Sequence, residues 1–270
     1  MDHDTAAPLP SRPLRRRFAS LRAIGALVLR EMATTNGRSP GGYIWAVLEP
    51  AAGIALLSVV FAAAFRTPPI GISFPMFYST GMLIFLMFND LQNKIAQSLL
   101  YSRQLLAYPT VTFMDAIIAR FALNLMTQLM VGYIILLGCM TLFETRVTPD
   151  LPVIVQAYAL TALLAIGVGV LNCYLFTRFD VMQRAWSILM RPMFILSGII
   201  FLFEMIPAPY ADFLWYNPLI HVTGLMRRGF YSTYEAAYVS PLYVIGLSLV
   251  CLTLGLVLLR RHHRDLLTRF

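Results

Sequence analysis

The feature that most constrains this chain is a series of long apolar runs separated by short polar or Pro-containing segments. Several runs exceed the roughly 20 residues that a helix needs to cross a bilayer. Their apolar residues are continuous rather than alternating with a period of two, which favours helices over the strands of a membrane barrel. Only 13% of the residues are charged, about half the share found in soluble globular domains. The chain is therefore predicted to be an all-α integral membrane protein.

The apolar runs predict six transmembrane helices. A further run at 213–226 is interrupted by Asn217-Pro218 and is too short to span, so it fits a re-entrant or interfacial helix pair. Both ends of the chain are basic and should lie in the cytoplasm, which requires an even number of spans. The predicted spans are 43–65, 74–88, 112–140, 153–176, 185–203 and 239–259.

This reading divides the chain into a membrane domain and shorter flanking segments. A cytoplasmic tail at 1–17 precedes an interfacial amphipathic helix at 18–38. A single six-span domain follows at 39–260, with a cytoplasmic helix at about 93–107 and a re-entrant segment at about 204–230, and 261–270 forms a second cytoplasmic tail.

The segment at 18–38 has the pattern of a helix that lies along the membrane surface. Its apolar residues fall on one helical face, whereas Arg22, Arg30 and Glu31 lie off that face. A basic amphipathic helix of this kind binds at the membrane interface. The alternative is that the segment is only the basic flank of the first span.

The one sizeable polar interruption between two apolar spans begins at Asn89 and separates the second span from the third. Its apolar residues could form one face of a short helix, and Pro109 would end that helix. We predict that this helix lies in the cytoplasm and receives force from a separate motor protein. The residues predicted to couple the chain to that motor are Lys94, Gln97, Leu100, Arg103 and Leu106.

The third span carries Arg120, Asn124 and Gln128 at intervals of four residues, which places them on one helical face. Polar groups within a span tend to face protein or a water-filled path, so these side chains are candidates for lining a substrate path. Hydrogen bonding between helices is the alternative. Arg191, beside Pro192 in the fifth span, is a fourth candidate, because arginines at a path entrance attract acidic groups.

No motif for catalysis is complete in this chain. A phosphate-binding loop needs Gly-rich backbone before a lysine, and the only lysine, Lys94, lies in QNKIAQ. The run NDLQN at 89–93 begins like an aspartate-rich prenyltransferase motif, and DAIIAR at 115–120 resembles part of a lipid-alcohol phosphotransferase motif, but both lack the acidic residues that should follow. We therefore expect no catalytic residue, metal site or cofactor in this chain, and an intramembrane lipid-modifying enzyme is the disfavoured reading.

The order of elements resembles that of the permease subunit of type-2 ABC exporters, and several short runs resemble the KpsM-type capsular polysaccharide permeases in particular. The resemblance covers roughly residues 25–260 in order. Each run alone is weakly specific, but together they are fairly specific. The runs are LRE at 29–31, GYIWAVLEP at 42–50, ISFPMF at 72–77, DAIIAR at 115–120, RPMFILSGIIF at 191–201 and NPLIHV at 217–222.

This resemblance implies a bacterial inner-membrane homodimer that works with two copies of a separate ATPase, which would bind ATP and Mg²⁺. The segment 93–107 would be the coupling helix seated on that ATPase. The implied substrate is a lipid-anchored acidic capsular polysaccharide, passed on to periplasmic and outer-membrane export proteins. A permease of the same fold could instead export O-antigen, teichoic acid or a drug. A nucleic-acid partner is not expected, because the net charge of +8 is concentrated at the termini and span ends.

Overall fold

A computed structural model describes residues 19–35, 41–106 and 112–268, and within these ranges the chain folds as helices joined by short loops, without a strand. The prediction of an all-α fold is confirmed for the described residues. The helices are α1 (Ala19–Thr35), α2 (Gly42–Ala64), α3 (Phe74–Ala96), α4 (Ser98–Leu106), α5 (Phe113–Leu142), α6 (Leu151–Arg178), α7 (Asp180–Leu196), η1 (Phe203–Met205), α8 (Ala208–Trp215), α9 (Pro218–Phe230) and α10 (Pro241–Thr268).

Four of these helices, α2, α5, α6 and α10, are long and apolar enough to cross a membrane. The predicted second and fifth spans correspond to α3 and α7, which do not reach that standard. The last turns of α3 carry Asn89, Asp90 and Lys94, and α7 has only 17 residues, with charged side chains along it.

The predicted fifth span, 185–203, extends beyond its helix, because α7 begins at Asp180 and ends at Leu196. The chain turns at Gly198, whose φ of +72° lies in the left-handed region that glycine adopts without steric cost. The apolar run continues through this turn, so hydropathy alone extends the span too far.

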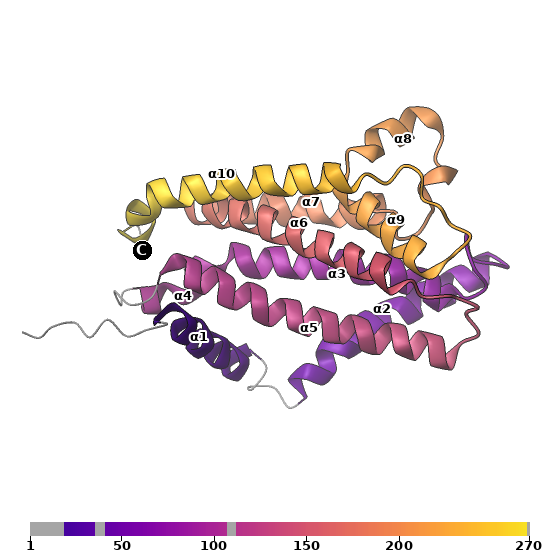
Figure 1. Cartoon of the computed structure of the whole chain (residues 1–270), viewed down its shortest axis with the longest axis horizontal. Helices are drawn as coiled ribbons and strands as arrows, with labels where there is room; N and C mark the ends of the chain where they lie inside the picture. Colours follow the sequence, from indigo (N-terminus) through magenta and orange to yellow (C-terminus); the bar gives the residue numbers. More distant parts are fainter. Residues whose placement is uncertain (1–18, 36–40, 107–111, 269–270) are drawn as a thin grey trace, which may run out of the picture.

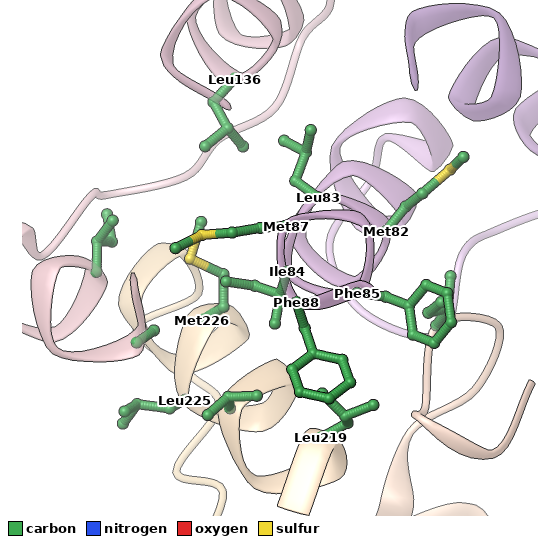
Figure 2. Packing of buried hydrophobic residues seen from close by; sticks show 14 of the residues in the cluster. Met82, Leu83, Ile84, Phe85, Met87, Phe88, Leu136, Leu219, Leu225 and Met226 are labelled. Atoms are coloured by element: carbon green, nitrogen blue, oxygen red, sulfur yellow. The ribbon is translucent and has the colours of Figure 1, made fainter. Parts of the chain in front are cut away.

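Helix α3 lies at the centre of the molecule and packs against α2, α5, α6 and α9 (Figure 1). It is buried for most of its length. Because neighbouring helices surround it, its apolar residues are not confined to one face. Figure 2 shows the centre of this core, where side chains of α3 meet those of α5 and α9: Met82, Leu83, Ile84, Phe85, Met87, Phe88, Leu136, Leu219, Leu225 and Met226.

The two ends of the helix bundle have different structures (Figure 1). At one end lie α1, α4 and the C-terminal part of α10, and we call this the α4 end. At the opposite end lie α8, α9 and the loop that joins α5 to α6, and we call this the α8 end. The two short amphipathic helices flanking the bundle, α1 and α4, therefore share one end.

The boundaries at the α4 end differ from the predicted coupling helix at 93–107. Helix α3 continues to Ala96, and its backbone breaks only at Gln97 before α4 begins at Ser98. Lys94 thus belongs to the last turn of α3. Ser98 connects the short helix α4 to α6 through a 3.6 Å contact with the sulfur of Cys173.

The segment 204–230 forms a pair of short helices, α8 and α9, preceded by the 3₁₀ turn η1. They are separated at the Asn217-Pro218 interruption found in the sequence. The side chain of Asn217 accepts a hydrogen bond from the backbone N–H of Leu219 at 3.1 Å, and Pro218 occupies the first position of α9. Asparagine as N-cap and proline at the first helical position both favour a helix start at this point.

Candidate functional site

A buried ion pair joins α5 to α1 near the α4 end. The Nε atom of Arg120 lies 3.0 Å from Oε1 of Glu31, and both side chains are only 6% exposed. A second guanidinium nitrogen of Arg120 donates a hydrogen bond to the backbone carbonyl of Lys94, at 3.0 Å. The charges compensate each other, and loss of either one would leave its partner buried and unpaired.

The same guanidinium group also contacts helix α4. Its central carbon lies 4.0 Å from the centroid of the Tyr101 ring, within the range of a cation–π interaction. Arg30 of α1 lies 5.7 Å from that ring. Residues Glu31, Lys94, Tyr101 and Arg120 therefore connect four helices, α1, α3, α4 and α5, and we call them the Arg120 node.

The polar stripe on α5 continues from Arg120 toward the middle of the bundle. Asn124 donates a hydrogen bond to the backbone carbonyl of Arg120 within the same helix, at 2.8 Å. Gln128 donates one to Oδ2 of Asp90 on α3, also at 2.8 Å. Arg120 and Gln128 thus make the hydrogen bonds between helices that the sequence left open as an alternative, and the role of the stripe in a substrate path stays a prediction.

A cavity of about 350 Å³ lies beside this stripe, between α1, α2, α3 and α5, and we call it the α5 cavity. Its apolar wall includes Met82, Leu86 and Leu123. Its polar wall combines three carboxylates, one ammonium group and several carboxamides, from Glu31, Glu49, Asn89, Asp90, Lys94, Asn124 and Gln128. Within the described part of the chain, no group of three or more His, Cys, Asp or Glu side chains is arranged to hold a metal ion.

The structure does not bring Arg191 into this cavity. Arg191 is exposed on α7 and lines a separate groove with Phe85 and Asn93 of α3. It also lines a hollow of about 610 Å³ that includes Leu100 of α4 and Arg184. The arginines predicted to attract acidic substrate therefore differ, because Arg120 is buried and paired whereas Arg191 is accessible.

The other residues predicted from the sequence lie on α1, α3 and α4. Arg22 is exposed on α1, Gln97 is half-buried at the break after α3, and Leu100 is half-buried on α4. Arg103 and Leu106 belong to α4, but their side chains lie outside the described part of the structure. Their predicted contact with an ATPase stays a prediction.

Arg227 on α9 is 1% exposed, and no role for it was predicted from the sequence. Its guanidinium group donates to the carbonyls of Phe201, at 2.8 Å, and Ile199, at 2.9 Å, and lies 4.2 Å from the ring centroid of Phe77. These contacts fix the turn after α7 against α9 and α3. Arg227 lies four residues after Thr223 and therefore on the same face of α9, and this spacing could have indicated that it is buried.

A hydrogen-bonded group of side chains lies near the α8 end. The hydroxyl of Tyr234 donates to Oε2 of Glu204 at 3.0 Å and lies 3.4 Å from the hydroxyl of Tyr238. Burial raises the pKa of Tyr238 to about 12, so its hydroxyl stays neutral at physiological pH. The ring of His221 lies between the carbonyl of Trp215 and the backbone N–H of Ser240.

Comparison with known proteins gives a consistent set of relatives. The model of the ABC-2 type transporter family matches residues 22–231, which contain the Arg120 node and the α5 cavity. The polysialic acid transport protein KpsM of Escherichia coli is 31% identical over 245 residues, covering 91% of this chain and 95% of that protein. The capsule polysaccharide export inner-membrane protein CtrC of Neisseria meningitidis is 27% identical over 241 residues, covering 89% and 91%. The protein BexB of Haemophilus influenzae, which has the same description, is 26% identical over 244 residues, covering 88% and 90%.

Proposed function

The chain belongs to the ABC-2 type transporter membrane family, and we propose that it is the membrane subunit of an ATP-driven exporter that moves capsular polysaccharide across the bacterial inner membrane. The observation that carries this proposal is its identity of 31% with a polysialic acid transport protein over nine-tenths of both chains. Relatives described as inner-membrane proteins support the location. The chain acts as a permease and not as an enzyme.

In this proposal the chain spans the membrane six times, with α3 and α7 added to the four long apolar helices. Side chains at the polar end of α3 are half-buried between neighbouring helices and line the α5 cavity, so they need not face lipid. Six spans place both termini on the same side, in agreement with the basic character of both ends. The α4 end then faces the cytoplasm, with α1 at the interface, and α8 and α9 re-enter from the opposite side.

The second element of the proposal is that α4 receives movement from a separate ATPase subunit, which binds ATP and Mg²⁺. Tyr101 on the exposed side of α4 contacts the guanidinium of Arg120, and Arg120 is paired with Glu31 of α1. Movement of α4 would therefore reach α1 and α5 through direct contacts. This geometry favours a mechanical role for Arg120, since its charge is already compensated.

The third element is a homodimer with two ATPase subunits. Within the described single chain, Met190 is the one residue of α7 that is buried, although α7 carries apolar side chains such as Ile188 and Ile195. A second copy packed against α7 would cover this surface. Arg191 would then lie near a path between the copies, where it could attract an acidic polymer. The substrate is proposed to be lipid-anchored and to pass on to periplasmic and outer-membrane export proteins.

Co-purification tests this proposal directly. The tagged chain is extracted in mild detergent from its native membranes, and the proteins that accompany it are identified and quantified. An ATPase subunit in equal amount is expected, and it should be lost when Leu100, which is half-buried on α4, is changed to aspartate. The control variant Glu144→Gln, at an exposed position in the loop between α5 and α6, should leave the complex intact. Purification of the chain without an ATPase under all conditions would refute the proposal.

The nature of the polymer is tested in cells that lack this chain. Capsular polysaccharide should accumulate in the cytoplasm and disappear from the surface. Accumulation of O-antigen, teichoic acid or a drug instead would mean that the chain is a permease of the same fold that exports that substrate. Turnover of a lipid substrate by the purified chain alone would favour the enzyme reading.

A further inference from the structure

The α5 cavity contains charges that the protein itself does not pair. Glu49 and Lys94 both line it, and within the described residues neither side chain forms a hydrogen bond or an ion pair. Asp90 accepts one hydrogen bond, from Gln128, and keeps capacity for more. The cavity therefore presents an ammonium group and carboxylates that can still bind a ligand carrying charges of both signs.

The position of the cavity suggests where an occupant comes from. Glu49 lies two turns into α2, about 10 Å along its axis from Gly42. It is exposed, so the cavity is open on the side of α2. Apolar side chains of Met82, Leu86 and Leu123 form the remaining wall. Polar groups near the end of a spanning helix, next to an apolar wall, match the boundary between lipid headgroups and acyl chains.

The volume and the chemistry of the lining define the ligand. About 350 Å³ is within the range of small-molecule sites, roughly 300–1,000 Å³. Carboxylates and carboxamide oxygens accept hydrogen bonds from an ammonium group, whereas the ammonium of Lys94 suits a phosphate. An occupant that satisfies both carries an ammonium and a phosphate on one short headgroup.

We propose that the α5 cavity binds the headgroup of a zwitterionic aminophospholipid from the surrounding membrane. Its ammonium group lies between Glu49 and Asp90, its phosphate contacts Lys94, and its glycerol and acyl chains lie along the apolar wall. This lipid site lies beside Asn124 and Gln128, two of the residues predicted to line a substrate path, and an acidic polysaccharide would be repelled there by Glu49 and Asp90. The inference does not depend on which polymer is exported.

The proposal makes a prediction about lipid selectivity. Phosphatidylethanolamine should bind best, since its primary ammonium donates three hydrogen bonds. Phosphatidylcholine presents the same charge without N–H donors, and phosphatidylglycerol presents no cation. Preference for phosphatidylethanolamine over phosphatidylglycerol is expected to be roughly fivefold, which converts to about 1 kcal/mol.

The experiment is native mass spectrometry of the full-length chain, purified in detergent with any subunits that accompany it. Each of the three lipids, with identical acyl chains, is titrated separately. Glu49→Gln and Asp90→Asn should each reduce the preference to less than twofold, and Glu49→Lys should reverse it toward phosphatidylglycerol. Glu144→Gln removes a carboxylate near the α8 end and should leave the preference unchanged. Circular dichroism confirms that each variant is folded.

Three results would overturn the proposal. One is equal or tighter binding of phosphatidylglycerol by the wild-type chain. The second is a preference that persists in both Glu49→Gln and Asp90→Asn, which would place the lipid elsewhere. The third is uniform weak binding of all three lipids, in wild type and variants alike, which would mean adventitious lipid only. Co-purification of the ATPase is measured on the same samples, so failure of the lipid site and failure of the exporter proposal are distinguishable.

Discussion

Removing the charges of Arg120 and Glu31, separately and together, tests whether the Arg120 node connects the helices at the α4 end. Both side chains are 6% exposed, so a single change leaves a buried, uncompensated charge. Breaking such a pair from one side costs about 3–5 kcal/mol. Arg120→Gln should fall in this range. Glu31→Gln should fall near its lower limit, because Arg120 keeps the Lys94 carbonyl and the Tyr101 ring.

The double variant decides between a connected pair and two independent residues. With both charges removed no unpaired charge remains, so the double variant should be more stable than the sum of the single effects predicts. The expected coupling energy is about 1–3 kcal/mol, as found for residues in direct contact. The assay is denaturant unfolding of the purified chain in a fixed detergent micelle, followed by circular dichroism. Additive effects, within about 0.5 kcal/mol, would refute the reasoning.

The role of the Arg120 node can also be tested by measuring capsule export in cells. Arg120→Ala should lower the amount of capsule at the cell surface relative to the amount of chain in the membrane, and the chain should still insert. Exchanging the two charges, as Glu31→Arg with Arg120→Glu, should restore part of the export that either single change removes. Unchanged export in Arg120→Ala would rule out any role for this side chain in transport.

The remaining predictions concern single positions. Gly255→Ala should destabilise the chain by about 1–3 kcal/mol, because its Cβ would lie 2.6 Å from a backbone nitrogen of α6. Gly138→Ala, on an open face of α5, is its control and should be neutral or stabilising by up to about 1 kcal/mol. Arg191→Gln should lower export of an acidic polymer without changing stability by more than about 0.5 kcal/mol, as unfolding and surface-capsule assays would show. Tyr101→Leu should leave ATPase binding intact but lower export, measured by co-purification and surface capsule together.

The sequence was sufficient for the helices and for the kind of protein. Apolar runs and their breaks predicted α2, α5 and α6 to within two residues at each end, because burial in lipid or protein requires apolar side chains over a whole span. The sixth span was predicted to end at 259, but α10 continues to Thr268, since its last turns are polar and hydropathy does not detect them. The turn at Gly198 was missed for a different reason. The residues after Leu196 are as apolar as those of a helix, although they form a buried turn. Composition alone cannot distinguish these two cases.

The sequence was less informative about the site because polar contacts form between residues far apart in the chain. The spacing of Arg120, Asn124 and Gln128 identified one face of α5, but it did not identify the helix that faces it. The partners are Glu31, located 89 positions away, and Asp90, located 38 positions away. A single sequence carries no signal that links such pairs.

Two arginines that are buried in the described part of the chain, Arg120 and Arg227, suggest how the bundle combines a fixed part with a movable one. Arg227 donates to two backbone carbonyls of the turn after α7, and these acceptors can leave only if the turn unfolds. Arg120 has one backbone acceptor, the Lys94 carbonyl of α3, and its other contacts are a carboxylate from α1 and a ring from α4, two short helices at the edge of the bundle. Movement of α4 can change the contacts of Arg120 without disturbing the core around α3. The α4 end is therefore expected to move during transport, while the turn fixed by Arg227 keeps its position.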